Sequence, residues 1–425
     1  MSRTGMAKSF RPSRRAVLGS GQPISQLMAQ ALAKPELISL AAGFVDQETL
    51  PVEATRETFG ELFADAAVAR RCLQYGTTLG DPELRELLLA RTFGSAETAG
   101  IRPDVEQVVV TSGSNQLLHL VAESLLDPGD IVLCASPTYL VFLGTLANLG
   151  ARSVGVKSDE LGMIPDGLEE QLQTLQRMGE SDRVKAIYLV NYFDNPRGIT
   201  MPAERISQVI AIAQRWSHTH RIHVIADEAY RELRYQGDDE ASALLLDEEG
   251  ETVIVAGTFS KSFSPGIRVG WGILPRHLVK PVCDQKGNID FGSPNLNQQL
   301  MRRVLERGIF ELHVDRIRNQ YTEKLSAMLD AAEEFLGPLE GVRWTRPDGG
   351  LYIWAELPEE IDTGPDGELF QKSVDQGVLY VPGQYAFAAE GSPVQRNTMR
   401  LSFGVQTCQR IHDGMAALSR AVGSL

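Results

Sequence analysis

The sequence predicts an α/β fold in which a mostly parallel sheet lies between helices, followed by a smaller α+β lobe. Short β-branched runs alternate with longer helical patterns between about residues 105 and 257. These runs are apolar with little alternation, which is typical of strands covered on both faces, and the helices between them indicate right-handed crossovers. The chain has 425 residues, more than one core usually holds, so we expect two domains.

The elements of the large sheet follow one another along the chain. Runs rich in valine and isoleucine predict strands, and the amphipathic segments between them predict helices. In chain order we expect a strand at 105–111, a helix at 115–126, a strand at 129–136, a helix at 138–150, a strand at 183–190, a helix at 204–216, and strands at 222–230 and 251–257.

The pattern changes past about residue 300. The long charged segment at 297–336 predicts one helix. Short segments with strand character follow it at 342–357, 377–383 and 398–404. We interpret this part as a smaller lobe that the N-terminal segment joins. The expected domains are therefore a large one at 60–300 and a small one made of 1–59 and 301–425.

Charge and cysteine content narrow the class of partner. The 55 acidic residues outnumber the 41 basic ones, and the formal charge of −14 disfavours binding to nucleic acid or to anionic membranes. A small-molecule partner is favoured. The four cysteines stand far apart without a Cys/His cluster, which argues against a disulfide framework and a metal site and favours the cytoplasm.

We expect neither a membrane span nor a secretory signal in this chain. No run reaches the ~18–20 apolar residues of a membrane span. The basic segment at 11–23 has too short an apolar run for a secretory signal, and a transit peptide stays an open alternative.

Polar residues follow several of the expected strands, where ligands bind in such sheets. Ser114 and Asn115 open a helix whose backbone N–H groups and dipole could hold an anion, or they only cap it. Tyr139 could stack on a flat ring or pack in the core. Asn195 precedes Pro196 in a turn that could aim its amide, or it serves the turn alone.

Two charged residues end neighbouring strands. Asp227 follows an apolar run, where a carboxylate is costly unless it meets a cation or a donor, or unless it caps a helix. Lys261 follows the next run, in the partly desolvated position that an amine nucleophile needs. Thr258, Ser260 and Arg268 around it supply donors suited to a phosphate. Together with a stacking aromatic, these residues predict a pyridoxal phosphate site with Lys261 as the Schiff-base amine.

Several motifs resemble those of a known family. The segment "TFSKSFSPGIRVGW" (258–271) resembles the lysine motif of fold-type I pyridoxal-phosphate enzymes of the class I/II aminotransferase family. "VIADEAY", the Asn-Pro-x-Gly turn, "RPDGGLYIW" and "TMRLSFG" are similar to other motifs of that family, from about residue 20 to the C-terminus. "CASPTYL" and "QYGTTLGDPELRELL" indicate the branch of 2-aminoadipate, kynurenine and related aminotransferases. The resemblance implies a seven-stranded, mostly parallel sheet and an aminotransferase that moves an amino group from an L-amino acid to a 2-oxo acid.

The resemblance also implies roles for single residues near the ring of the cofactor. Lys261 would form the Schiff base and move the substrate proton. Asp227 would keep the pyridine nitrogen protonated, and Tyr139 would stack on the ring. Tyr230 and Asn195 would hydrogen-bond the ring oxygen.

The phosphate and substrate sites follow in the same way. The phosphate would be bound by Ser114, Asn115, Thr258, Ser260 and Arg268. Tyr75 would reach the phosphate bound by the neighbouring subunit, which implies a homodimer with shared active sites. Arg400 would clamp the substrate carboxylate, unless it forms a structural ion pair, and the backbone of Gly43 would approach the substrate near it. Asn195 would also belong to the substrate site.

The chain departs from the family pattern mildly at Ala42, where relatives often carry a second glycine, and at two places that matter more. Arg197 stands where threonine is usual in the Asn-Pro-x-Gly turn, and we expect it to affect at most the rim of the pocket. The family's aminoadipate-type members carry an arginine after an isoleucine in the first helix, whereas Ser25 follows Ile24 here. A strong preference for dicarboxylic substrates is therefore not expected.

Other functions remain as alternatives. The same site could catalyse β-elimination, decarboxylation or racemisation, because the pocket selects which bond to Cα breaks; an arginine that holds the carboxylate disfavours decarboxylation. A transcription regulator with an aminotransferase-like domain is less favoured, because the match begins near residue 20 and the net charge is negative. A cofactor-free homologue is the third alternative, and the retained Lys261 argues against it.

Overall fold

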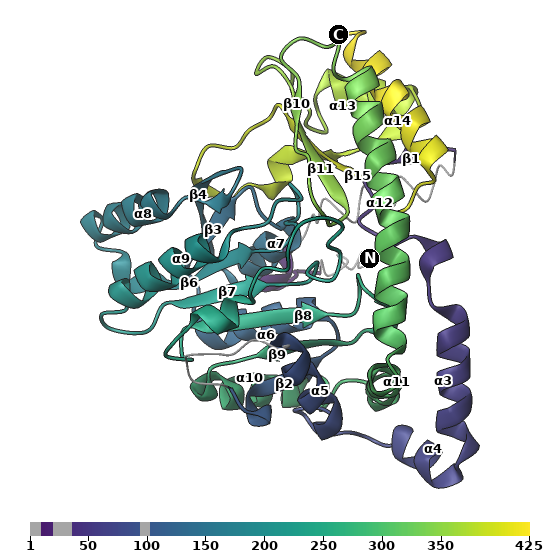
Figure 1. The fold of residues 1–425 in the computed structure, drawn as a ribbon. Coiled ribbons are helices and arrows are strands. Elements are labelled where there is room, and N and C mark those ends of the chain that lie inside the picture. The colour runs from purple at the N-terminus through teal and green to yellow at the C-terminus, as the bar shows by residue number, and fades with distance from the viewer. Residues whose placement is uncertain (1–9, 20–35, 94–102) are drawn as a thin grey trace, which may run out of the picture.

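The computed structural model describes residues 10–19, 36–93 and 103–425. The substitution noted after Ile24 lies outside the described residues. Figure 1 shows a large α/β part, a smaller part that holds the C-terminus, and the long helix α12 running beside both. Within the described ranges, no helix combines the length and the apolar character needed to cross a bilayer.

The helices are α1 (Arg14–Leu18), α3 (Val52–Ala64), α4 (Ala66–Cys72), α5 (Pro82–Phe93), α6 (Ser114–Leu125), α7 (Leu140–Leu149), α8 (Pro165–Arg177), α9 (Ala203–Trp216), α10 (Arg276–Ile289), α11 (Asn295–Glu306), α12 (Ile309–Phe335), α13 (Glu368–Asp375) and α14 (Cys408–Val422). The strands are β1 (Ile38–Ser39), β2 (Val108–Thr111), β3 (Ile131–Ser136), β4 (Arg152–Asp159), β5 (Gly162–Met163), β6 (Val184–Val190), β7 (His223–Asp227), β8 (Val253–Thr258), β9 (Gly270–Ile273), β10 (Arg343–Trp344), β11 (Tyr352–Glu356), β12 (Val378–Leu379), β13 (Val381–Pro382), β14 (Glu390–Gly391) and β15 (Thr398–Ser402).

The central sheet is mostly parallel, as predicted. Its described strands run in the order β14-β4-β3-β6-β7-β8-β9-β2, with β5 paired to β4. The strands from β14 to β8 are parallel, and β9 is antiparallel to both β8 and β2. Two-residue strands β14 and β5 add to the seven longer strands that were expected. The register places Val190, Asp227 and Ala256 side by side, so the carboxyl ends of three strands meet at one edge.

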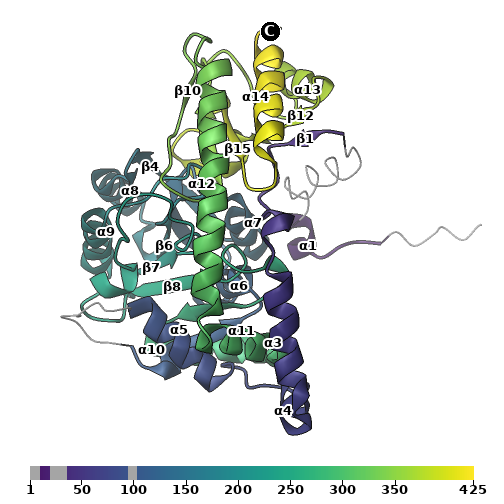
Figure 2. The same ribbon diagram turned by 45° about the vertical axis from the view of Figure 1, so that its right-hand side comes forward.

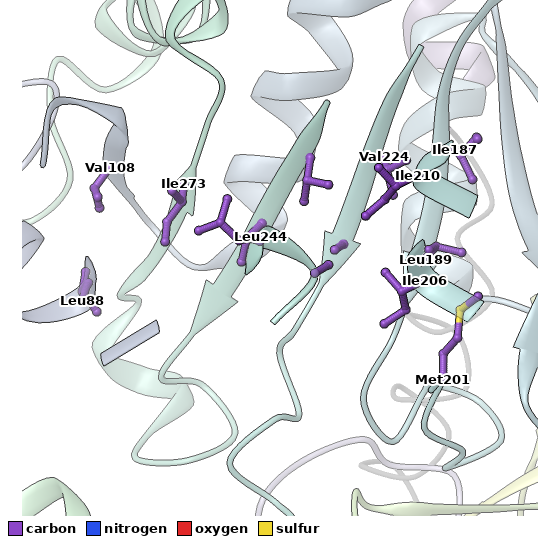
Figure 3. Close-up of a cluster of buried hydrophobic side chains, with 14 of the residues drawn as sticks. Leu88, Val108, Ile187, Leu189, Met201, Ile206, Ile210, Val224, Leu244 and Ile273 are labelled. Carbon is purple, nitrogen blue, oxygen red and sulfur yellow. The ribbon is translucent and has the colours of Figure 1, made fainter. Parts of the chain in front are cut away.

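Both faces of this sheet are buried. On β6, Ile187 and Leu189 belong to one apolar cluster, and Ala186 and Tyr188 belong to the other. Figure 3 shows part of the first cluster, where α9 and its neighbours lie against β6 and β7. Each fully buried leucine or isoleucine contributes about 1.5–3 kcal/mol to folding. A strand covered on both faces explains the short apolar runs with little alternation.

The smaller part contains an antiparallel sheet in the order β10-β11-β15-β13, packed with α13 and α14. The prediction of one helix at 297–336 was wrong. The structure has α11 and α12 with a break between them, because Gly308 adopts a φ of +66°, a left-handed conformation that interrupts a helix. The domain limits at residues 60 and 300 stay a prediction.

Candidate active site

A cavity of about 380 Å³ lies at the carboxyl ends of the central strands, where residues of the smaller sheet also reach it. The predicted residues that line it are Gly43, Ser114, Asn115, Tyr139, Asn195, Asp227, Tyr230, Thr258, Ser260, Lys261, Arg268 and Arg400. Tyr75 is not among the lining residues of this chain. It follows α4 with 79% of its surface exposed and touches Phe291 edge to face, at 5.7 Å between ring centroids.

Asp227 ends β7 and is only 4% exposed. The Tyr188 hydroxyl donates to its Oδ2 at 3.0 Å, and the backbone N–H of Ala229 donates to its Oδ1 at 3.1 Å. Burial raises the pKa of Asp227 to about 6, although both hydrogen bonds lower it. The chain turns after Asp227 without forming a helix, so Asp227 is not a helix cap.

Lys261 lies in the connection between β8 and β9. Its Nζ donates a hydrogen bond to the carbonyl oxygen of Gly43 at 2.8 Å and lies 5.8 Å from the centre of the Tyr230 ring. A backbone carbonyl carries no full charge, so the amine is held in place without an ion pair. The Lys261 side chain thus faces the same cavity as the carboxylate of Asp227.

The phosphate-type donors converge at one end of the cavity. The Thr258 hydroxyl donates to Ser260 Oγ at 2.9 Å, and Arg268 donates to Ser260 Oγ at 3.4 Å and to the carbonyl of Ser112 at 2.9 Å. Helix α6 begins at Ser114, and its N-cap residue is Gly113, which has no side chain to cap the helix. Its first N–H groups are therefore available to an anion, which the helix dipole favours.

The loop before α6 requires glycine. Gly113 has a φ of +86°, and a Cβ there would lie 2.4 Å from Nη2 of Arg268. Arg268 itself has a φ of +49°, an uncommon conformation for a residue with a side chain. Such backbone conformations cluster at functional sites, where the surrounding structure holds them.

Tyr139 and Asn115 meet across the cavity wall. Tyr139 precedes α7, and its hydroxyl donates to Asn115 Oδ1 at 3.2 Å. The Tyr139 ring is half-buried and lines the cavity. It also packs against the apolar cluster that contains Leu118 and Phe142, so it lies between this cluster and the cavity, where a flat ring could stack.

Arg400 comes from β15 of the smaller sheet and is 2% exposed. Its guanidinium donates to Asn195 Oδ1 at 2.8 Å and to the carbonyl of Ala41 at 2.7 Å, and it lies 4.3 Å from the Tyr352 ring centre. In the part of the chain that is described, Nε has no hydrogen-bond partner and no carboxylate pairs with Arg400. This disfavours the structural ion pair, and a buried cation without an anion suits an anionic ligand.

Sequence reasoning missed several residues around the site. Tyr188 holds Asp227, and the ring of Tyr352 lies against Arg400. Tyr352 lies inside the "RPDGGLYIW" motif, but nothing in the sequence shows that its hydroxyl faces the cavity. Arg197 is buried and donates to Asp194 and to the carbonyl of Asp159. Since Arg197 is not among the described residues that line the cavity, the structure gives no support to an effect on its rim.

The residues present fit pyridoxal phosphate. A buried carboxylate with a raised pKa suits a protonated pyridine nitrogen, an amine faces the same space, and an arginine with two hydroxyls lies beside an uncapped helix N-terminus. These four features are chemically different, and they meet in one cavity. The cavity is therefore the candidate site for this cofactor.

Comparison with known proteins agrees with this geometry. Residues 35–411 match the family described as Aminotransferase class I and II. An aromatic-amino-acid aminotransferase of Thermococcus litoralis is 36% identical over 91% of this chain and 88% of its own. A kynurenine aminotransferase structure from Pyrococcus horikoshii has a TM-score of 0.87 and 33% identity, with 97% of each chain covered.

A further solved structure carries the cofactor in derivatised form. The α-aminoadipate aminotransferase of Thermus thermophilus, in complex with N-(5'-phosphopyridoxyl)-L-leucine, has a TM-score of 0.83 and 30% identity over 97% of each chain. The resemblance seen in the motifs is thereby confirmed. The chain belongs to the class I and II aminotransferases and is a pyridoxal-phosphate-dependent transaminase.

Proposed function

We propose that this transaminase takes its amino group from neutral L-amino acids with apolar side chains, and that the predicted site residues act in the roles given above. One combination of features carries the proposal. Arg400 is a buried cation without an anionic partner in the described chain, and an apolar wall lies beside it. The wall consists of Phe44, Leu140, Val141, Val190 and the Tyr352 ring.

The residues of this chain have different roles in the reaction. Bound pyridoxal phosphate supplies an electron sink for the charge that develops at the substrate Cα. Arg400 binds and orients the α-carboxylate by the bidentate geometry of its guanidinium. Lys261, as the neutral amine, would take the proton from the substrate Cα, a step worth ~10²–10⁴-fold in rate. Asp227 holds a proton on the ring nitrogen, and Tyr139 covers the ring face and excludes water.

The apolar wall sets the expected side-chain class. The charged residues that line the cavity in the described chain are Asp227, Lys261, Arg268 and Arg400, and each has a role above. A second carboxylate against the wall would lose its hydration without gaining a partner, which is costly. The names of the aromatic and kynurenine relatives agree with this class, and the α-aminoadipate relative makes the dicarboxylic alternative worth testing.

A homodimer with shared sites is part of the proposal. Figures 1 and 2 show α3 and α4 at the margin of the molecule, where they contact α11. Leu73, Tyr75 and Phe291 are exposed large apolar residues in and beside this part, and such residues usually mark an interface when they gather. Tyr75 is then free to reach a second chain. A cytoplasmic location stays a prediction.

A spectroscopic panel tests the function. The absorbance of the loaded enzyme is followed between 300 and 500 nm while single amino acids are added. Leucine and phenylalanine should convert the cofactor from its aldehyde to its amine form, with kcat/KM at least about tenfold above that for 2-aminoadipate, since tenfold corresponds to about 1.4 kcal/mol. A 2-oxo acid should restore the first spectrum.

Two arginine variants complete this test. Arg400→Lys keeps the charge but not the bidentate fork, so KM for every donor should rise with cofactor affinity little changed. Arg197→Lys is the matched control, a buried arginine outside the cavity, and its KM should stay that of the wild type. A preference for 2-aminoadipate would contradict the substrate class, and products released without the amine form would move the reaction to a lyase.

A further inference from the structure

Tyr352 links three parts of the active site. It begins β11 and is buried. In the β11–β15 register it pairs with Ser402, and Arg400 lies two residues from Ser402 on the same face of the sheet. Its hydroxyl lies 3.0 Å from the hydroxyl of Tyr230. A Cβ on Gly43 would come within 2.7 Å of the Tyr352 oxygen, so this hydroxyl also lies directly against the segment that holds Lys261.

The proton count of the two hydroxyls fixes the direction of their hydrogen bond. Each phenol carries one proton and can accept further bonds. If Tyr230 uses its proton for the ring oxygen of the cofactor, which rests on the proposed function, it has none left for Tyr352. The Tyr352 hydroxyl must then be the donor, and Tyr230 both accepts from it and donates onward.

We propose that Tyr352 is a positioning residue for the reaction: its hydroxyl donates to Tyr230 and so directs the Tyr230 proton onto the ring oxygen of the cofactor. Tyr352 does not touch that oxygen itself. It acts through Tyr230, and the relay runs from the smaller sheet into the large one. The ring of Tyr352 meanwhile supports Arg400, so one side chain serves the carboxylate site and the cofactor site together.

The charges around the pair act differently on the two phenols. Burial would raise the pKa of Tyr352, but the charges of Arg400 and Lys261, helped by the Tyr230 hydrogen bond, bring it below its usual value. Burial instead raises the pKa of Tyr230. Tyr139 and Tyr321 are the other ionisable groups that interact with Tyr352.

The test reads the bound cofactor and needs no turnover. A hydrogen bond stabilises negative charge on the ring oxygen, so its loss raises the pH at which the cofactor absorbance between 300 and 500 nm changes form. We expect Tyr230→Phe to raise this midpoint by about one unit and Tyr352→Phe by about half a unit, the size of one or part of one hydrogen bond. In the double variant, Tyr352→Phe should add nothing to Tyr230→Phe.

A control variant and the double variant distinguish the possible outcomes. Tyr380→Phe removes another buried hydroxyl of the smaller part, one that donates to the Thr363 carbonyl at 2.9 Å, and should leave the midpoint unchanged. If Tyr230→Phe shifts the midpoint and Tyr352→Phe does not, the inference fails while the proposed function stands. A shift by Tyr352→Phe that persists in the Tyr230→Phe background would also overturn it. No shift in Tyr230→Phe would remove the proposed role of Tyr230 and this inference with it.

Discussion

The carboxylate of Asp227 is prepared for a cation that the protein itself does not supply. It is buried at the end of β7, and no lysine or arginine of the described chain lies within ion-pair distance of it. Two hydrogen bonds hold its oxygens, yet burial still raises its pKa to about 6. A protonated pyridine nitrogen would provide the missing charge. The cofactor-free protein is therefore expected to be less stable because Asp227 is ionised.

Asp227→Asn should stabilise the cofactor-free protein while it removes activity. The folded-state pKa lies above the usual 3.8, so the free energy of unfolding of the wild type falls as pH rises from about 4 to about 6. The neutral variant lacks this fall, and it can keep both hydrogen bonds because the Tyr188 hydroxyl can rotate to accept from the amide. We expect a gain of about 1–3 kcal/mol at pH 8 and a smaller one at pH 5, measured by urea unfolding.

A second buried carboxylate serves as the control for this experiment. Asp247 accepts two backbone N–H bonds on one oxygen, from Thr252 at 2.7 Å and from Val253 at 2.8 Å. Asp247→Asn should not gain stability, because the amide weakens these charge-assisted bonds. A variant Asp227→Asn that is less stable than the wild type at pH 8 would contradict the argument.

Motifs explain which site residues the sequence could reveal. Lys261, Asp227 and Arg400 stand in segments whose composition is unusual for a strand end, because a buried charge there needs a chemical reason. Tyr188 and Tyr352 stand in ordinary apolar strands, where tyrosine is common. The contacts of their hydroxyls could be identified only from the structure. No sequence spacing predicts a contact between β6 and β7 or between β11 and the loop after β7.

Among the elements, the strands in runs of apolar residues were predictable, whereas β4, with eight residues, was not. Strands β2, β3, β6 and β7 fall inside the expected segments, and β8 ends one residue beyond its segment. Strand β9 is a four-residue strand with two glycines, and its pairing to β8 and β2 depends on the hairpin that carries Arg268. Gly308 likewise interrupts a segment whose charge and apolar pattern favour one continuous helix. The helix or strand propensity of a segment thus fails to predict its structure where one backbone conformation or pairing with a neighbouring strand determines it.

Helix α10 positions the loop before α6 through a chain of side chains. Buried Lys286 donates to Asp290 at 2.7 Å, and Gln116 donates to the same carboxylate at 2.7 Å. Gln116 in turn accepts from the backbone N–H of Ser112 at 2.7 Å, while Arg268 donates to the Ser112 carbonyl. Both the N–H and the carbonyl of Ser112 are therefore hydrogen-bonded, and Ser112 leads into the proposed phosphate site.

Gln116→Met should weaken cofactor binding without changing the chemistry of the loaded enzyme. The substitution keeps the length of the side chain but removes its bonds to Ser112 and Asp290. The loss of about 0.5–1.5 kcal/mol per hydrogen bond predicts a Kd for pyridoxal phosphate that is about 2- to 10-fold higher, measured by absorbance titration of the cofactor-free protein. At saturating cofactor kcat should be that of the wild type.

The control for this variant lies on another helix. Gln214 on α9 has similar side-chain bonds, to Asp247 and Thr252, at a distance from the cavity. Gln214→Met should leave the Kd unchanged. Equal affinities for the wild type and Gln116→Met would show that the loop does not depend on α10.

At the scale of the whole molecule, the site is assembled from segments that are far apart in the chain. Gly43 comes from the N-terminal part, Lys261 from the central sheet and Arg400 from the smaller sheet, and each touches a residue of another part. The sequence indicated these segments separately, but their convergence follows from the topology. Tyr75 is the exception, because the site within one chain does not include it. Its proposed role therefore needs a second copy.

Two variants that are inactive alone should restore activity together. If each site combines Lys261 of one chain with Tyr75 of the other, a mixed dimer of Lys261→Ala and Tyr75→Ala chains holds one intact site and one site with both defects. With random pairing, about half of the dimers are mixed and each has one intact site of two, so about a quarter of the wild-type activity should be recovered. The assay uses a cofactor concentration at which Tyr75→Ala dimers do not bind the cofactor. The chains are co-expressed with different tags, and sedimentation verifies the dimer. Activity equal to the mean of the two separate variants would show that Tyr75 does not serve the site of a partner, because no mixed dimer would then contain an intact site.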